Sequence, residues 1–376
     1  MLFFIIALLI PLLVQLVLVL CGFWSFEDKR KVTLSAGVGI AISSIICILA
    51  YFISVSKTNF NEIGNFKIIS LKYEEKWTTK ESYTVEVYDH TDEDGTTHYR
   101  TETRYRTDEH GPFWTACDEY SDSHSISPNE YNKWAMIWGQ NKTGVHKGSS
   151  DGFDRAITGN IYEAKWNNRF EDIYPWEEIW QYKNKVRVSN SVFKWPEPSK
   201  NLKEKYPRPA DQKNVSPIIS YGPAIPESAI LLLRQTNAYL GKSCQVHCMV
   251  LLFGPDRDRS VVDDVLSAWQ GPNMNELAMF VGLDSDNQIL WCDVQSWSDN
   301  TTIHSELRTK IVDMKQFDPV KLSQIWLSEI PNHWYRKDFK KDFGYIRVPI
   351  SIWWFIVSIV LCAGSSVGLS YKIRKE

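Results

Sequence analysis

Two long apolar runs open the chain, and they constrain its fold more than any other feature. The first covers residues 2–23 and the second residues 34–55, and neither contains a charged side chain. Each run matches the roughly 20 residues that an α-helix needs to cross the hydrocarbon core of a bilayer. We therefore expect residues 1–55 to form a transmembrane hairpin.

A third apolar run, at residues 348–369, lies near the end of the chain and is followed by a short basic tail. With residues 347–376 as a further span and tail, the sequence predicts a multi-pass α-helical anchor in contact with the lipid bilayer. A cleaved signal peptide is the alternative for the first run. We favour an uncleaved span, because the run is longer than a signal-peptide core and no basic residue precedes it.

Basic residues near the spans predict the orientation of the chain. Lys29, Arg30 and Lys31 lie in the short link between the first two spans, and three more basic residues follow the third span. The positive-inside rule assigns such segments to the cytoplasm, which makes the central domain periplasmic or extracellular. The basic residues between Arg336 and Arg347 favour the opposite orientation, but long domains are translocated largely regardless of charge.

Small residues recur at a spacing of four in two of the spans. Gly364 and Gly368 share one face of the third span, and Gly39 and Ser43 share one face of the second. Small side chains let two helix backbones approach closely. Such faces predict either packing among the three spans of one chain or a homodimer through Gly364 and Gly368.

A proline-rich segment divides the region between the spans. Residues 196–226 contain seven of the 16 prolines, which is a poor composition for a helix or a central strand. We interpret the segment as a linker, or alternatively as an extended arm, between a β-rich subdomain at 56–195 and an α/β layered subdomain at 227–346. The net charge of only −3 is not that of a nucleic-acid-binding protein.

The β-rich subdomain contains a predicted hairpin. Residues 83–88 and 97–105 alternate polar with β-branched or aromatic residues around an acidic turn that ends at Gly95. A two-residue turn would place His90 and His98 on opposite faces, which argues against a metal site between them. Strands are also expected at 159–165 and 185–193, and a helix capped by Ser127 is expected through residue 137.

The second subdomain alternates helix and strand. Helices are expected at 227–240, 260–269, 301–314 and 319–330, and strands at 245–253, 277–283 and 289–294, which is the order of an α/β layered domain. Cys244 and Cys248 would lie on one strand about 13 Å apart, too far to bridge each other. Either cysteine pairs with Cys292 in one disulfide, or all are buried thiols.

The run from Tyr239-Leu240-Gly241 through the strand at 246–253 and the helix ending at Trp269 to the apolar strand at 277–283 resembles the TPM domain. That resemblance implies an extracytoplasmic module that binds a divalent ion or a partner protein and sometimes has weak phosphatase activity. The residues that would carry Ca²⁺ or Mg²⁺ are Asp263, Glu276, Asp284 and Asp286. Glu276 stands where an aspartate is more usual in that family.

The order of segments along the whole chain also resembles a group of uncharacterised phage and bacterial membrane proteins, which implies a phage origin. No Gly-x-Ser-x-Gly elbow, phosphate-binding loop, dinucleotide motif or His-Glu-x-x-His pair is present. We therefore expect a non-enzymatic, membrane-anchored interaction protein at the host envelope that needs no cofactor and binds another membrane or envelope protein. The alternatives are a divalent-metal-dependent hydrolase and an accessory subunit of a membrane complex.

Overall fold

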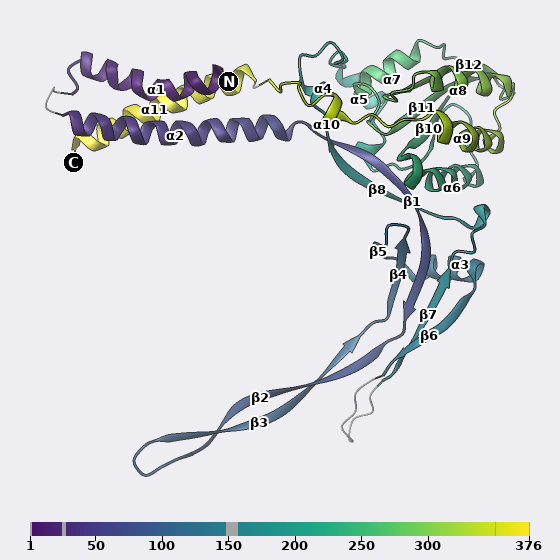
Figure 1. The fold of residues 1–376 in the computed structure, drawn as a ribbon, viewed down its shortest axis with the longest axis horizontal. Helices are drawn as coiled ribbons and strands as arrows, with labels where there is room; N and C mark the ends of the chain where they lie inside the picture. Colours follow the sequence, from purple (N-terminus) through teal and green to yellow (C-terminus); the bar gives the residue numbers. More distant parts are fainter. Residues whose placement is uncertain (1, 25–27, 148–156, 350, 376) are drawn as a thin grey trace.

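The computed structural model describes residues 2–24, 28–147, 157–349 and 351–375, with side chains omitted for residues 2–4 and 355. These residues form a mixed α/β protein with three parts: a bundle of three apolar helices, an α/β domain beside it, and a β-rich part that extends into a long ribbon (Figure 1). The predicted combination of apolar helices with an α+β region is thus confirmed at the level of fold class.

The helical bundle consists of α1 (Leu2–Leu20), α2 (Lys29–Ser56) and α11 (Ile352–Lys375), which lie side by side (Figure 1). Of the described helices, α2 and α11 are long and apolar enough to cross a membrane. Helix α1 is equally apolar, but the part whose side chains are described, Ile5–Leu20, is shorter. Two candidate spans are therefore established by length and composition, and the third remains a prediction.

Polar and small side chains hold the three helices together. The Gln15 side-chain amide donates to the hydroxyls of Ser35 (3.0 Å) and Ser370 (2.8 Å), and the Trp24 indole donates to the Gln15 carbonyl oxygen (3.0 Å). A Cβ atom on Gly39 would lie 3.0 Å from the Cβ of Pro11, so the glycine favours this close approach.

The two glycines of α11 have a different environment. A Cβ atom on Gly364 or Gly368 would meet no atom within 4 Å, so both residues face away from the other two helices. Intramolecular packing therefore applies to Gly39, whereas the Gly364 and Gly368 face is free for a contact with another molecule.

Strand β1 (Asn59–Glu74) follows α2 after a link of two residues and organises the β-rich part. Its first half pairs with β8 (Tyr174–Lys183) and its second half with β4 (Phe113–Asp118) and β7 (Gly159–Lys165). Short strands β5 (Ser123–Ser125) and β6 (Gln140–His146) extend this sheet.

Helix α3 (Pro128–Trp138) packs its aromatic side chains on the β-rich sheet. The predicted cap is confirmed, because the Ser127 hydroxyl accepts from the Glu130 N–H (3.2 Å) and the Glu130 carboxylate accepts from the Ser127 N–H (3.1 Å).

The predicted hairpin is longer than its sequence pattern. Strands β2 (Trp77–Thr91) and β3 (Thr97–His110) pair with each other as a separate two-stranded sheet, which we call the ribbon. The ribbon projects beyond the β-rich sheet and bends toward the side of the molecule that carries the helical bundle (Figure 1).

The α/β domain is built on four strands in the order β12-β11-β10-β9. Strands β9 (Ile218–Tyr221), β10 (His247–Phe253) and β11 (Glu276–Leu283) are parallel, and β12 (Ile289–Ser296) is antiparallel to β11. Every residue of β10 and β11 is buried. Helix α7 (Val261–Trp269) covers one face, and the other face is covered by α6 (Glu227–Cys244), α8 (Thr302–Asp313) and α9 (Pro319–His333). The predicted layered arrangement is confirmed.

Two predictions about secondary structure were wrong. Residues 185–193 contain a short helix, α4 (Lys185–Val188), and no strand. Helix α6 was expected to end at Gly241 but continues to Cys244. The glycine does not end the helix and instead allows a close contact, since a Cβ atom there would lie 1.8 Å from the Asn65 carbonyl oxygen on β1. Of the two alternatives for the proline-rich segment, a linker or a packed arm, the structure favours the second, since the segment supplies helix α5 (Lys200–Lys205) and edge strand β9.

The cysteines are all free thiols. Cys244 ends α6 and Cys248 lies on β10. The expectation that both cysteines lie on one strand was therefore wrong. Of the two alternatives that the sequence left open, the structure has the one without a disulfide.

Candidate functional site

The four carboxylates expected to hold a divalent ion do not lie together. Asp263 is exposed on α7, and Asp284 and Asp286 lie in the turn between β11 and β12. Glu276 begins β11, so it is separated from Asp284 by the length of that strand, about 26 Å. The structure therefore provides no single site for Ca²⁺ or Mg²⁺ made from this set.

Each of these carboxylates has a local environment that explains its presence. Asp284 accepts the backbone N–H groups of Asp286 and Gln288, both at 2.8 Å, which is turn chemistry. Asp263 lines an open hollow in which Arg259 forms an ion pair with Asp293 (2.6 Å). A cation in that hollow would meet the arginine, so the hollow does not suit a metal ion.

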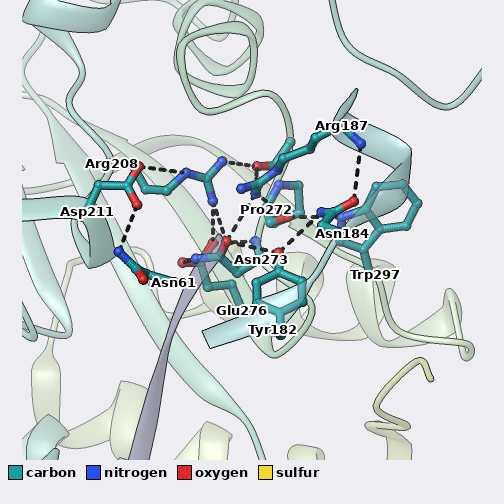
Figure 2. A network of polar contacts seen from close by, with 11 residues as sticks. Asn61, Tyr182, Asn184, Arg187, Arg208, Asp211, Pro272, Asn273, Glu276 and Trp297 are labelled. Carbon is teal, nitrogen blue, oxygen red and sulfur yellow. Dashed lines mark hydrogen bonds and ion pairs between the residues drawn. The ribbon is translucent and has the colours of Figure 1, made fainter. Parts of the chain in front are cut away.

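Glu276 belongs to a buried polar network, drawn in Figure 2. Its carboxylate accepts the Asn273 N–H at 2.6 Å and lies 3.7 Å from the Arg208 guanidinium. Arg208 and Arg187 both donate to the Asn273 side-chain oxygen, at 2.7 and 3.1 Å, and to the carbonyl oxygen of Gly271. The side chains of Arg187, Arg208, Asn273 and Glu276 are all buried, and so is the ion pair between Arg208 and Glu276.

The charge in this network explains its role. Burial, and next the neighbouring Arg187 charge, lower the pKa of Arg208 to about 10, so Arg208 remains charged at neutral pH. Two buried cations around one carboxylate repel a divalent metal ion. The role of Glu276 is therefore structural: with Arg208, Arg187 and Asn273 it holds the proline-rich segment and α4 against the loop before β11.

A pocket of about 370 Å³ lies next to this network. Tyr182 joins the two, because its hydroxyl donates to the Asn273 side-chain oxygen (3.1 Å) while its ring lines the pocket. Apolar walls come from Met274 and Phe339, and the rim carries three lysines, Lys183, Lys185 and Lys340. The pocket can hold a small molecule, and the carboxylate of Asp338 in its lining accepts the backbone N–H groups of Lys340 (2.9 Å) and Lys341 (3.1 Å).

A second buried cluster fastens β1 to the α/β domain. The Asn65 side chain donates to the Val246 carbonyl oxygen (3.0 Å), and the Asn275 side chain donates to the Ile63 carbonyl oxygen (2.7 Å). His247 contacts Asn65 through Nδ1 (3.1 Å), and its Nε2 atom has no partner among the described residues. Complete burial lowers the pKa of His247 to about 3, so the ring is neutral at physiological pH.

The ribbon is the most exposed part of the β structure, and its two faces differ. Tyr88 pairs with Tyr99, and Tyr105 pairs with Ser82, so three tyrosines share one face, which we call the tyrosine face. Their exposed fractions are between 54% and 63%. The opposite face carries charged side chains in ion pairs, such as Arg106 with Glu81.

The tip of the ribbon differs from the sequence prediction. His90 and His98 are directly opposite each other, because an irregularity after Tyr88 shifts the strand register and the connecting loop covers residues 92–96. Their rings stack at 4.7 Å between centroids. The expectation that they lie on opposite faces was wrong. Among the described residues, His90, Asp92 and His98 are the group of side chains arranged closely enough to hold a metal ion.

Sequence reasoning missed the network around Glu276 because Arg187 and Arg208 lie in segments predicted as a strand and a linker. No spacing in the sequence connects them to Asn273. The ribbon histidines were noticed, but the register that joins them depends on one extra residue in β2.

The chain matches no family model, and no curated protein matches it. The similarity to the TPM domain and to phage membrane proteins therefore stays a prediction, and the argument about function rests on the geometry of the chain.

Proposed function

We propose that this chain is a membrane-anchored, extracytoplasmic interaction protein that binds another membrane or envelope protein through the tyrosine face of its ribbon. The observation that carries the proposal is the ribbon itself: two strands that pair only with each other among the described residues, with both faces exposed. Two-stranded sheets gain little stability alone, so such a long one is not explained by the core of the protein.

The helical bundle supports the anchoring part of this proposal. Its interior holds small and polar residues such as Gln15, Ser35 and Gly39, whereas its outer surface exposes large apolar side chains. Among the latter are Leu13, Leu16, Val17, Ile45, Leu49, Phe52 and Val360. This distribution suits helices surrounded by lipid, where polar groups are satisfied between helices. All three helices would then span the bilayer.

The tyrosine face supports the binding part. Tyrosine is enriched in protein interfaces, because its ring gives a large contact area with little loss of conformational entropy. The unpaired edges of the ribbon also offer backbone donors and acceptors to an extended partner segment. Since the ribbon bends toward the side of the helical bundle (Figure 1), its partner would lie beside the bundle.

Site-specific photocrosslinking in the cells that express the protein tests this proposal. A photoreactive residue at Tyr99 or Tyr105 is expected to give one discrete adduct with a membrane or envelope protein. Tyr83 is the matched control, because it is a tyrosine on the opposite face of the same ribbon with 47% exposure. Equal adducts at Tyr83 and Tyr99, or none at Tyr99, would contradict the proposal.

Thiol labelling tests the extracytoplasmic placement. Cys292 is buried and cannot report on it, but Val192 has 93% of its surface exposed. A Val192→Cys variant is expected to react with a membrane-impermeant reagent in intact cells, or in spheroplasts if the domain is periplasmic. Reaction only after lysis would place the domain in the cytoplasm.

An accessory subunit of a membrane complex is a second candidate, favoured by the outward face of Gly364 and Gly368. The metal-dependent hydrolase has no such support, because the carboxylates on which it depended are far apart and Glu276 is neutralised by arginine.

A further inference from the structure

The tip of the ribbon brings three potential metal ligands together. The Nε2 atom of His98 lies 2.7 Å from one carboxylate oxygen of Asp92, and the Nε2 atom of His90 lies 3.3 Å from the other. The ligand atoms of all three side chains lie within 4.8 Å of one another. We propose that His90, Asp92 and His98 form a binding site for Zn²⁺ or a similar first-row transition-metal ion.

These distances are close to those of a loaded site. With Zn–N and Zn–O bonds of about 2.0–2.2 Å, neighbouring ligands of a tetrahedral zinc ion are about 3.3 Å apart. The contact at 3.3 Å already has this length, the contact at 2.7 Å would lengthen by about 0.6 Å, and ligand atoms that now lie up to 4.8 Å apart would move closer together as the ion enters. His90 and His98 are directly opposite each other in the strand register, so the backbone requires no change, although their stacked rings must rotate for both lone pairs to point at one ion.

A fourth residue positions one of the ligands. Nδ1 of His90 lies 3.0 Å from the Asp89 carboxylate. An Nδ1–H that donates to this carboxylate leaves the Nε2 lone pair of His90 directed at the site, which is the usual arrangement of metal-binding histidines. Asp89 is thus a positioning residue and not a ligand.

The donor set selects the class of metal. Two imidazole nitrogens and one carboxylate oxygen suit Zn²⁺, Co²⁺, Ni²⁺ or Cu²⁺, whereas Ca²⁺ and Mg²⁺ take mainly oxygen ligands. The side chains are about half exposed, so an ion from solution can enter, and water or a partner's side chain can take the fourth position. This inference does not depend on the proposed function of the ribbon.

Calorimetric titration of the full chain in detergent, prepared without a polyhistidine tag, tests the proposal with Zn²⁺ alone. One equivalent of Zn²⁺ is expected to bind the natural chain. Asp89→Asn should weaken binding about tenfold. His90→Gln, His98→Gln and Asp92→Asn each remove a ligand and should weaken it further.

Glu93→Gln is the matched control, because it removes the same charge from the same loop without touching the cluster. Equal binding by the natural chain and His98→Gln, or equal losses in Asp92→Asn and Glu93→Gln, would overturn the proposal.

Hydrogen exchange separates a lost site from a lost fold. Zn²⁺ joins the two strands, so it should slow amide exchange at residues 88–100 in the natural chain and not in His98→Gln, while β10 and β11 exchange alike in both. Slowing that is equal in the two proteins, or that occurs only outside the ribbon, would also overturn the proposal.

Discussion

Acidification should weaken the α/β domain through one buried histidine. His247 lies in the cluster that joins β1 to β10, and burial lowers its pKa to about 3, compared with about 6.5 for an exposed histidine. Between these two values the unfolded chain binds a proton that the folded chain does not. The free energy of unfolding therefore decreases as the pH falls below about 6.5, and the decrease continues to about pH 3.

The size of the effect follows from the two pKa values. Between pH 7.5 and pH 5 only the interval below the unfolded-state pKa of about 6.5 counts, which is about 1.5 pH units. The free energy of unfolding should therefore decrease by about 2 kcal/mol. His247→Asn removes the titrating ring and keeps a polar group near Asn65. The free energy of unfolding of this variant should therefore not show the decrease that His247 causes between pH 7.5 and pH 5.

Urea unfolding of both proteins at pH 7.5, 6 and 5, followed by tryptophan fluorescence in detergent, measures the difference. Other acidic and basic groups contribute equally to the two proteins, so their difference isolates His247. If the natural chain and His247→Asn lost the same stability between pH 7.5 and pH 5, the reasoning would be refuted.

Three further substitutions test other contacts. Gly241→Ala should destabilise the chain by about 1–3 kcal/mol or more in denaturant unfolding, because its Cβ would overlap the Asn65 carbonyl oxygen, and unchanged stability would contradict this packing. Glu276→Gln removes the buried carboxylate beside two buried guanidiniums, of which Arg208 keeps only the half-exposed Asp211 at 4.0 Å, and should cost about 3–5 kcal/mol in the same assay, whereas a loss below 1 kcal/mol would mean that the ion pair is not buried. Gly364→Leu should reduce crosslinked assemblies in membranes without changing the fold, and Gly37→Leu, also in open space, should not; equal effects would exclude a specific α11 interface.

The periodic parts of the fold could be predicted from the sequence. The apolar strands of the α/β domain are continuous runs because both faces of β10 and β11 are covered by helices, and the Ser127 cap carries its signal in adjacent residues. The segment at 185–193 misled the prediction because its β-branched residues lie in a short helix and a loop, where tertiary contacts of Arg187 override local preference.

The candidate sites were harder to predict, since they depend on residues far apart in the chain. Glu276 was selected as a metal ligand by its place beside a strand, but Arg208, 68 positions earlier, decides its chemistry. The pairing of His90 with His98 depends on a bulge near Asp89, and a single inserted residue reverses which side chains share a face.

Helix α2 is separated from β1 by only Lys57 and Thr58, and β1 is about 50 Å long. If α2 spans a bilayer, a change in its tilt would be passed on to β1 through this two-residue link. Membrane helices change tilt when bilayer thickness changes, and a tilt of about 10° would swing the far end of a rigid arm of this length by about 9 Å. In the proposed membrane anchor, the reach of the ribbon would thus depend on the thickness of the bilayer around α2.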